Sequence, residues 1–286
     1  MISKLYKNKD IVYSCEVFPP KKDDEFNKIF ACLDSLGELG LDFISVTYGA
    51  GGSNAVKNVD IASYIKNKLN IEALAHMTCV GFKKEQLISG IKALEDAGVT
   101  SVLALRGDRP KAMTDEEFNS REFEYASDMI KFIKSISSME TAGACYPEKH
   151  FEAISTKADI DALKIKVESG CDFLISQLFL DNDRFYELLE KTEKLGIDVP
   201  ISAGIMPITS AKQLGTTVSL SGTSIPKLFS DIVAKYSENP EDMYKAGVDY
   251  AIRQALDLKA HGVRGIHGYV MNKPTLAKDF MGAVMA

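Results

Sequence analysis

The sequence lacks long apolar runs and has little cysteine, and both features bear on where the protein works. No stretch approaches 18 uninterrupted apolar residues, and the lysines near the amino terminus are not followed by an apolar segment, so neither a membrane span nor a secretory signal is predicted. The five cysteines form no Cys-x-x-Cys pair, which indicates reduced thiols rather than a disulfide framework. We therefore expect a cytoplasmic protein that does not associate with membranes.

Motifs for nucleic-acid, nucleotide, acyl-transfer and metal chemistry are also missing. The net charge of -6 and the lack of clustered Lys and Arg argue against nucleic-acid binding. Residues Tyr48–Asn54 lack the third glycine of a dinucleotide fingerprint, and neither G-x-x-x-x-G-K-[ST] nor G-x-S-x-G occurs. Their glycines instead predict a loop that lies close to a flat ligand ring. We expect no metal site, because four potential ligands match no recurrent zinc spacing: His76, Cys79, Cys145 and His150.

The sequence does contain a regular alternation of short β-branched runs and longer amphipathic segments. The predicted strands are Ile11–Phe18, Asp42–Thr47, Glu72–Cys79, Ser101–Arg106, Glu140–Tyr146, Asp172–Gln177, Pro200–Ile205 and Val263–Val270. The predicted helices between them are Asp24–Leu39, Ala55–Leu69, Lys84–Ala97, Ala126–Ser137, Ala158–Ser169 and Asn182–Leu195. The long segment before the last strand has room for two or three helices, including Glu241–Ala260, and a final helix follows Pro274.

Parallel strands joined by helices form either an open doubly wound sheet or a closed barrel. Eight regular units followed by one terminal helix favour the barrel. We predict an α/β fold, a (β/α)8 TIM barrel with extra helices between strands 7 and 8. No linker or composition shift divides the chain, so one domain is expected over residues 1–286.

In a barrel of this kind, ligands bind at the carboxyl ends of the strands. Nearly every predicted strand ends in polar side chains, namely Glu16, Thr47, His76 with Thr78, Arg106 with Asp108, Tyr146 with His150, Gln177, and Tyr269 with Asn272. Arg106 and Asp108 flank a glycine that permits close backbone approach, so these two charges either face a polar ligand or pair with each other.

Glu16 is the most informative of these residues. Pro19 and Pro20 lack a backbone N–H and keep the preceding residues extended, so the strand must end beside the carboxylate. A surface carboxylate on an edge strand is the alternative. Its position between Cys15 and Val17 favours a buried acid instead.

Seven motifs together resemble the methylenetetrahydrofolate reductase family, in order and spacing from about Ser14 to Pro207: S-C-E-V-F-P-P, F-I-S-V-T-Y-G-A-G-G-S, A-H-M-T-C, A-L-R-G-D, Y-A-S-D, C-Y-P-E-K-H and I-S-Q-L-F-L-D. The resemblance implies a TIM barrel that binds FAD and reduces 5,10-methylenetetrahydrofolate to 5-methyltetrahydrofolate. It further implies that NADH or NADPH reduces the flavin and leaves before the folate enters the same site.

The resemblance also implies roles for single residues. Glu16 matches the catalytic acid, Asp108 an aspartate near flavin and pterin, and Gln177 and Gln213 substrate-binding amides. The positions that match FAD contacts are Thr47, His76, Arg106, Gly107, Asp108, Tyr125, Ala126, Tyr146, His150, Asp159 and Lys166.

Some positions depart from the family pattern. Ala162 and Ile165 replace the usual Asn and Arg beside the FAD diphosphate, and Lys273 replaces an Arg that meets the glutamate tail. The aromatic residue that commonly follows Gln213 is absent near Thr217, and some relatives in anaerobes take electrons from partner subunits. An electron-transfer partner protein is therefore the alternative donor, and a binding scaffold without turnover is a third hypothesis that Glu16 disfavours.

The sequence also predicts a homo-oligomer. Apolar residues of Ile225–Phe229 are expected to be exposed and to join subunits.

Overall fold

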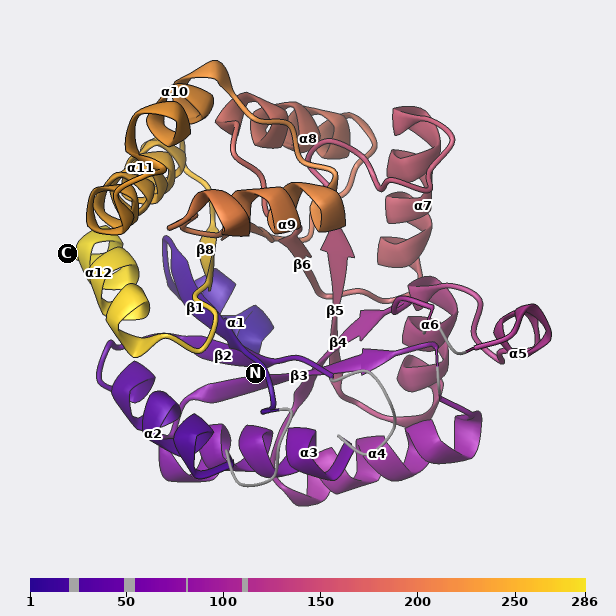
Figure 1. Ribbon diagram of the computed structural model, residues 1–286. Coiled ribbons are helices and arrows are strands. Elements are labelled where there is room, and N and C mark those ends of the chain that lie inside the picture. Colours follow the sequence, from indigo (N-terminus) through magenta and orange to yellow (C-terminus); the bar gives the residue numbers. More distant parts are fainter. Residues whose placement is uncertain (21–25, 49–54, 81, 110–112) are drawn as a thin grey trace.

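The computed structural model describes residues 1–20, 26–48, 55–80, 82–109 and 113–286, and it contains a closed barrel of parallel strands. Helices surround the strands when the molecule is viewed along the barrel (Figure 1). The strands, which pair in sequence order, are β1 (Val12–Val17), β2 (Phe43–Val46), β3 (Glu72–Thr78), β4 (Ser101–Leu105), β5 (Glu140–Cys145), β6 (Phe173–Ser176), β7 (Ile201–Ile205) and β8 (Gly265–Tyr269). Each lies inside its predicted range, and the pairing of β1 with β8 confirms the barrel.

Helices connect the successive strands, as the amphipathic segments predict. They are α2 (Phe26–Gly37), α3 (Ala55–Ser63) with a π-helical turn η2 (Tyr64–Lys68), α4 (Lys84–Asp96), α6 (Ala126–Ile136), α7 (Thr156–Glu168) and α8 (Asn182–Lys194). The segment between β7 and β8 forms α9 (Ala211–Ser221), α10 (Lys227–Tyr236) and α11 (Pro240–Ala260), and α12 (Pro274–Met285) ends the chain. Two short helices were not predicted, α1 (Ile2–Asn8) and α5 (Asp115–Asn119).

Helix α2 illustrates how the sequence pattern produces the outer layer. Ile29, Leu33 and Leu36 recur at helical spacing and are buried against the barrel, while Phe26 and Phe30 are partly buried. The first predicted residues of this helix, 24 and 25, lie outside the described residues. After the helix, Gly40 adopts a positive φ of 76°, which lets the chain turn toward β2.

The amino ends of the strands are closed by helix α1. Ile2 and Tyr6 of this helix are buried in an apolar cluster inside the barrel, together with Phe43 and Phe173. The Tyr6 hydroxyl lies 2.7 Å from Ser202 Oγ of β7. This packing fills one end of the barrel interior and leaves the carboxyl end for a ligand.

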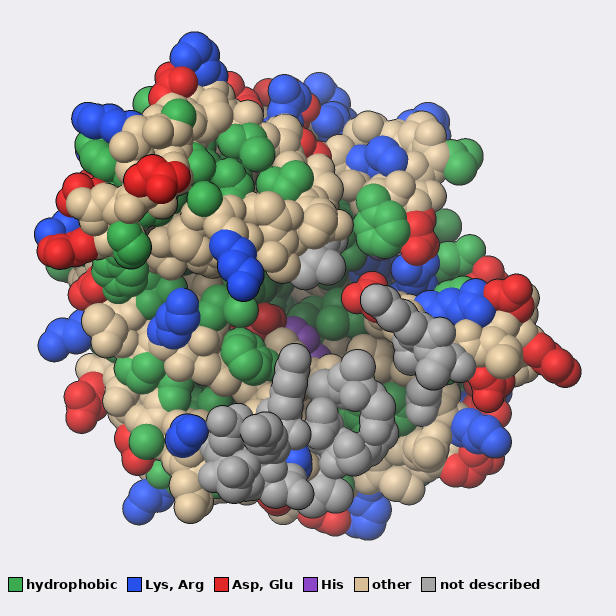
Figure 2. All heavy atoms as spheres, in the orientation of Figure 1, with side chains coloured by type: hydrophobic (Ala, Val, Ile, Leu, Met, Phe, Trp, Pro, Cys, Tyr) green, Lys and Arg blue, Asp and Glu red, His purple; other side chains and the backbone are tan. Residues whose placement is uncertain are grey.

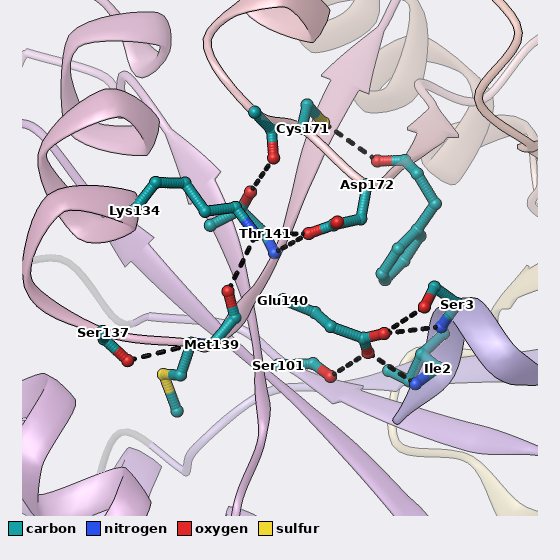
Figure 3. A network of polar contacts seen from close by, with 12 residues as sticks. Ile2, Ser3, Ser101, Lys134, Ser137, Met139, Glu140, Thr141, Cys171 and Asp172 are labelled. Atoms are coloured by element: carbon teal, nitrogen blue, oxygen red, sulfur yellow. Dashed lines mark hydrogen bonds and ion pairs between the residues drawn. The ribbon is translucent and has the colours of Figure 1, made fainter.

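A buried carboxylate holds α1 in place (Figure 3). Glu140, at the start of β5, is 2% exposed and accepts hydrogen bonds from the Ile2 N–H at 2.6 Å and the Ser3 N–H at 3.1 Å. It also accepts from the Ser3 and Ser101 hydroxyls. An acceptor at these N–H groups satisfies donors that have no partner within the helix.

The expected subunit contact at Ile225–Phe229 is partly wrong. Ile225 and Leu228 are exposed, but Phe229 is fully buried in a separate apolar cluster with Leu180 and Met243. Phe229 therefore fixes α10 to the barrel and cannot contribute to an outer surface.

Candidate functional site

A cavity of about 710 Å³ opens at the carboxyl ends of the strands. This volume lies within the range of ordinary ligand pockets. The corresponding face is hollowed near its centre, where histidine side-chain atoms are visible (Figure 2). Most of the predicted site residues line this cavity, namely Glu16, Thr47, His76, Arg106, Gly107, Asp108, Tyr146, His150, Gln177 and Gln213. The carboxyl groups of Glu16 and Asp108, which are far apart in sequence, thus face the same cavity.

Strand β1 directs Glu16 into the barrel. Cys15 and Val17 are fully buried in the apolar layer between strands and helices, so the alternation of a strand turns the intervening Glu16 inward. The strand ends as the prolines predict. The residue after the strand, Phe18, is held by the side chain of Asn272. The Asn272 amide oxygen accepts from the Phe18 N–H at 3.0 Å, and its nitrogen donates to the Phe18 carbonyl at 2.8 Å.

Glu16 and His76 meet without forming an ion pair. Burial raises the pKa of Glu16 from 4.5 to about 8 and lowers the pKa of His76 from 6.5 to about 3. At neutral pH the carboxyl group is therefore protonated and the imidazole is neutral. The Glu16 Oε2 atom lies 3.6 Å from His76 Nε2, a buried nitrogen with no hydrogen-bond partner in the described part of the chain. A protonated acid thus faces the cavity beside an uncharged ring.

Strand β8, which pairs with β1, supplies two further side chains to the cavity, Tyr269 beside Glu16 and His267 beside Ser14. His267 Nδ1 lies 2.7 Å from Ser14 Oγ, and burial lowers the pKa of this histidine to about 3. The Tyr269 hydroxyl donates to the Ser176 carbonyl at 2.8 Å. A Cβ atom on Gly204 would lie 2.3 Å from that same carbonyl oxygen, so only glycine allows this close approach.

The Arg106-Gly107-Asp108 turn lies at the cavity rim. Gly107 has a φ of 79°, and a Cβ there would lie 2.9 Å from the Thr78 Cβ. Both facts require glycine. Arg106 forms a two-pronged ion pair with Glu152 of the next strand's loop, with Nη2 to Oε1 at 3.0 Å. The suggested pairing of Arg106 with Asp108 is therefore wrong, and Asp108 is exposed to the cavity.

The loop after β5 contributes two rings. Tyr146 and His150 meet edge to face with their centroids 4.7 Å apart. The backbone N–H of His150 donates to Asp159 at 3.3 Å, and His150 Nδ1 accepts from the Glu152 N–H at 3.1 Å. This acceptor role places any proton of the neutral imidazole on Nε2.

The two amide side chains differ in how they are held. Gln177 Oε1 accepts from the Leu178 N–H at 2.8 Å. Gln213 is held at both ends, because its Oε1 accepts from the Thr209 N–H at 3.0 Å and its Nε2 donates to the Pro207 carbonyl at 3.2 Å. Gln213 thus fixes the first turn of α9 as well as lining the cavity.

The remaining predicted residues lie outside the cavity wall: Tyr125, Ala126, Asp159, Lys166 and Lys273. Lys166 points inward from α7, donates to the Ala144 carbonyl and has a pKa lowered by burial. Lys273 is exposed at the start of α12, and Tyr125 is exposed before α6. Their ligand-binding roles stay predictions, and the glycine loop at 49–54 lies outside the described residues.

Sequence reasoning missed His267 and Glu152. His267 stands two residues before Tyr269, so the alternation of a strand could have shown that both face the barrel interior. No local signal links Glu152 to Arg106, because the two are 46 residues apart. Metal binding gains no support, since the described part of the chain brings no three potential ligands together.

No helix among the described residues is both long enough and apolar enough to cross a membrane. The features gathered here, a closed parallel barrel and a carboxyl-end cavity containing an acid of raised pKa, define a TIM-barrel protein with a candidate active site at the carboxyl ends of its strands.

The family is given by comparison with known proteins. A family model described as methylenetetrahydrofolate reductase matches residues 1–284, and the chain belongs to that family. This confirms the resemblance seen in the motifs and the prediction of an oxidoreductase.

Individual relatives agree with this assignment. The chain is 30% identical to the 5,10-methylenetetrahydrofolate reductase of Pectobacterium carotovorum over 92% of this chain and 87% of that protein. Identity to the Escherichia coli protein of the same name is 29%, with the same coverage. An Arabidopsis thaliana methylenetetrahydrofolate reductase (NADH) is 31% identical over 99% of this chain but only 49% of its own length. The chain thus spans about half of that plant protein.

The fold also has a close counterpart among solved structures. A Clostridium thermocellum protein that binds two copies of 5-methyl-5,6,7,8-tetrahydrofolic acid superposes with a TM-score of 0.68, covering 99% of this chain and 98% of that one. Because the two sequences are 13% identical, this likeness establishes the fold alone.

Proposed function

We propose that this protein reduces 5,10-methylenetetrahydrofolate to 5-methyltetrahydrofolate with FAD as cofactor and NADH or NADPH as electron donor. The donor and the folate use the same cavity in turn. The observation that carries the proposal is Glu16, a carboxyl group whose pKa of about 8 keeps it protonated at the cavity wall. A partly buried acid of this kind, whose side chain is 21% exposed, suits a reaction that needs a proton in a confined site.

The residues of the cavity suit FAD. The volume of about 710 Å³ accommodates a flat ring system. Arg106 supplies a cation at the rim for the diphosphate, and the buried His76 Nε2 has no partner among the residues that the structure describes. Tyr146 and His150 lie in contact on the same side of the cavity as Arg106, and their aromatic rings and polar atoms are available to a ligand there. Thr47 and the Gly107 backbone complete this half of the wall.

One further group would reach FAD only if its side chain moved. Lys166 now donates to the Ala144 carbonyl. FAD, when bound, supplies the capacity to accept a hydride from one ligand and pass it to another.

Glu16 then acts as the proton donor. The five-membered ring of the folate opens to a reactive iminium when one of its nitrogens is protonated and departs. Glu16 can hold a proton for that nitrogen at neutral pH because burial disfavours its charged form. The neutral His76 beside it adds no positive charge that would lower the pKa of the acid.

The remaining cavity groups orient the folate. Asp108 presents an exposed carboxylate that favours cationic species in the cavity. The Gln177 amide nitrogen can donate to a pterin acceptor, because only its oxygen is used by Leu178. Lys273 supplies a positive charge outside the cavity wall for the glutamate tail. The Clostridium thermocellum protein of the same fold, which binds 5-methyltetrahydrofolic acid, supports a folate as the ligand.

A second candidate has a partner protein as the electron donor. Thr217 lines the wall contributed by α9, and α9 contains no aromatic residue that would stack on a nicotinamide.

We also propose a homo-oligomer, for which exposed Ile225 and Leu228 supply apolar surface.

One anaerobic experiment tests the function and separates the donors. The purified protein is loaded with FAD and mixed with NADH or NADPH, and the absorbance of the flavin is followed; methylenetetrahydrofolate is then added. Bleaching followed by recovery supports the proposal. If neither NADH nor NADPH bleaches the flavin, dithionite is used to reduce it instead. Recovery of the absorbance when the folate is then added indicates a protein donor. No recovery with the folate contradicts the proposed reaction.

A further inference from the structure

Glu148 joins two parts of the cavity rim that are far apart in sequence. This residue lies in the loop between β5 and α7, two positions after Tyr146. Its Oε1 atom accepts from the Thr223 hydroxyl at 2.8 Å and from the Ser224 N–H at 2.9 Å. Thr223 is 4% exposed, so its hydroxyl has little access to water as a substitute partner. One carboxylate oxygen thus binds the end of the α9 segment.

Helix α9 depends on its ends for its position. It contributes four side chains to the cavity, which are Gln213, Thr216, Thr217 and Ser221. Leu214 is buried in an apolar cluster that Val218 joins partly buried, and Thr217 is buried as well. At its amino end, the Ser210 hydroxyl and the Gln213 amide cap the chain. At its carboxyl end, Gly222 turns the backbone with a φ of 69°, and the Glu148 bonds follow directly.

Glu148 lies between two helix ends of opposite electrostatic effect. The carboxyl end of α9 disfavours a nearby carboxylate, whereas the amino end of α10, which begins at Lys227, favours one, so helix electrostatics alone do not select this position. The loop that carries Glu148 is itself fixed on its other side, where Glu152 pairs with Arg106 at the end of β4. Glu148 therefore connects α9 to the side of the cavity formed by Arg106 and Tyr146.

We propose that Glu148 is a positioning residue that holds the α9 wall against the second ligand of the cavity, whether folate or nicotinamide. This inference rests on the proposed function, in which FAD occupies the side with Arg106, Tyr146 and His150. Glu148 does not line the cavity, so it acts through Thr217 and Ser221, the cavity side chains toward the carboxyl end of α9. Loss of its bonds frees the α9 end and weakens binding of whatever lies between α9 and the flavin.

The test compares Glu148→Ala and Glu148→Gln with the control Glu168→Gln. Glu168 is exposed on α7 and lies 4.0 Å from Lys164 in a surface ion pair. For Glu148→Ala, the KM for methylenetetrahydrofolate should rise about tenfold or more, with kcat changed less than about threefold, because charged hydrogen bonds are lost from a binding wall. FAD affinity, measured by quenching of flavin fluorescence, should change less than about threefold. Glu148→Gln keeps an acceptor oxygen, so its KM should lie close to that of the parent protein.

A second variant separates positioning from folding. Thr223→Val removes one donor but leaves the Ser224 bond, and should raise KM by a smaller factor, while combining it with Glu148→Ala should add nothing. An unchanged KM for folded Glu148→Ala, or an equal loss of FAD affinity, would overturn the inference. If the parent protein binds neither FAD nor 5-methyltetrahydrofolate by calorimetry, the proposed function fails instead.

Discussion

Glu16 Oε2 lies 3.6 Å from His76 Nε2, and both groups are uncharged at neutral pH. In water the same two side chains would form a carboxylate beside a partly protonated imidazole. Burial at the carboxyl end of the barrel reverses both preferences, because it disfavours each charged form. The acid therefore keeps its proton beside an uncharged imidazole, and it faces the same cavity as Asp108.

The first prediction concerns the pH dependence of the reaction with folate. Because the acid must be protonated and its pKa is about 8, the rate of flavin reoxidation by methylenetetrahydrofolate should be flat near neutral pH. Above about pH 8 it should fall about tenfold per pH unit. Stopped-flow absorbance across this range measures it. A rate that rises with pH contradicts an acid at Glu16.

The same shift affects stability. The folded-state pKa of Glu16 is raised above its ordinary value of 4.5, so the folded protein binds more protons than the unfolded chain between about pH 4.5 and 8. Stability contributed by this group is full below that window and is lost as pH rises through about 8. Urea unfolding of Glu16→Gln should show a shallower loss over this window. Identical pH slopes for the two proteins would argue against a raised pKa.

Gly204→Ala should destabilise the barrel. The new methyl group would lie 2.3 Å from the Ser176 carbonyl and 2.7 Å from the Tyr269 ring, so the free energy of unfolding should fall by about 1–3 kcal/mol. Gly215→Ala in α9 is the matched control, because its added carbon would meet no atom within 4 Å. That change should stabilise by up to about 1 kcal/mol. Chemical denaturation distinguishes them, and equal effects would show that Gly204 is not sterically required.

Glu140→Gln should loosen helix α1 without altering the cavity. The neutral amide replaces a carboxylate that accepts from Ile2, Ser3 and Ser101, so the free energy of unfolding should fall by about 2 kcal/mol. Glu168→Gln, on an exposed surface, should change it by less than about 0.5 kcal/mol. Ligand binding should be retained, because α1 closes the opposite end of the barrel. A loss no greater than that of the control would contradict the role of this network.

The fold could be predicted because its signals are local. Each strand is a short apolar run followed by a helix with its own buried stripe, and parallel topology then places all strand ends on one face. Glu16 could be found in this way, since prolines and buried neighbours mark its position. Helices α1 and α5 were missed because they are short and have no long apolar pattern.

The rest of the site depends on contacts between distant segments. Arg106 meets Glu152, and Glu148 meets Thr223, only after the barrel brings their loops together. Lys166 was expected near a ligand, but its side chain turns inward to the Ala144 carbonyl, a direction that helical spacing alone does not fix. Such pairings arise from the packed structure and leave no periodic trace in the sequence.

The most direct test of the central claim is stopped-flow measurement of both half-reactions in Glu16→Gln. The amide keeps the shape of the side chain but cannot donate a carboxyl proton. Flavin reoxidation by methylenetetrahydrofolate should slow by about 10²- to 10⁴-fold, the usual contribution of a positioned proton donor, while flavin reduction by its donor should be nearly unchanged. An equal loss in both half-reactions would contradict the assignment of Glu16 as the acid.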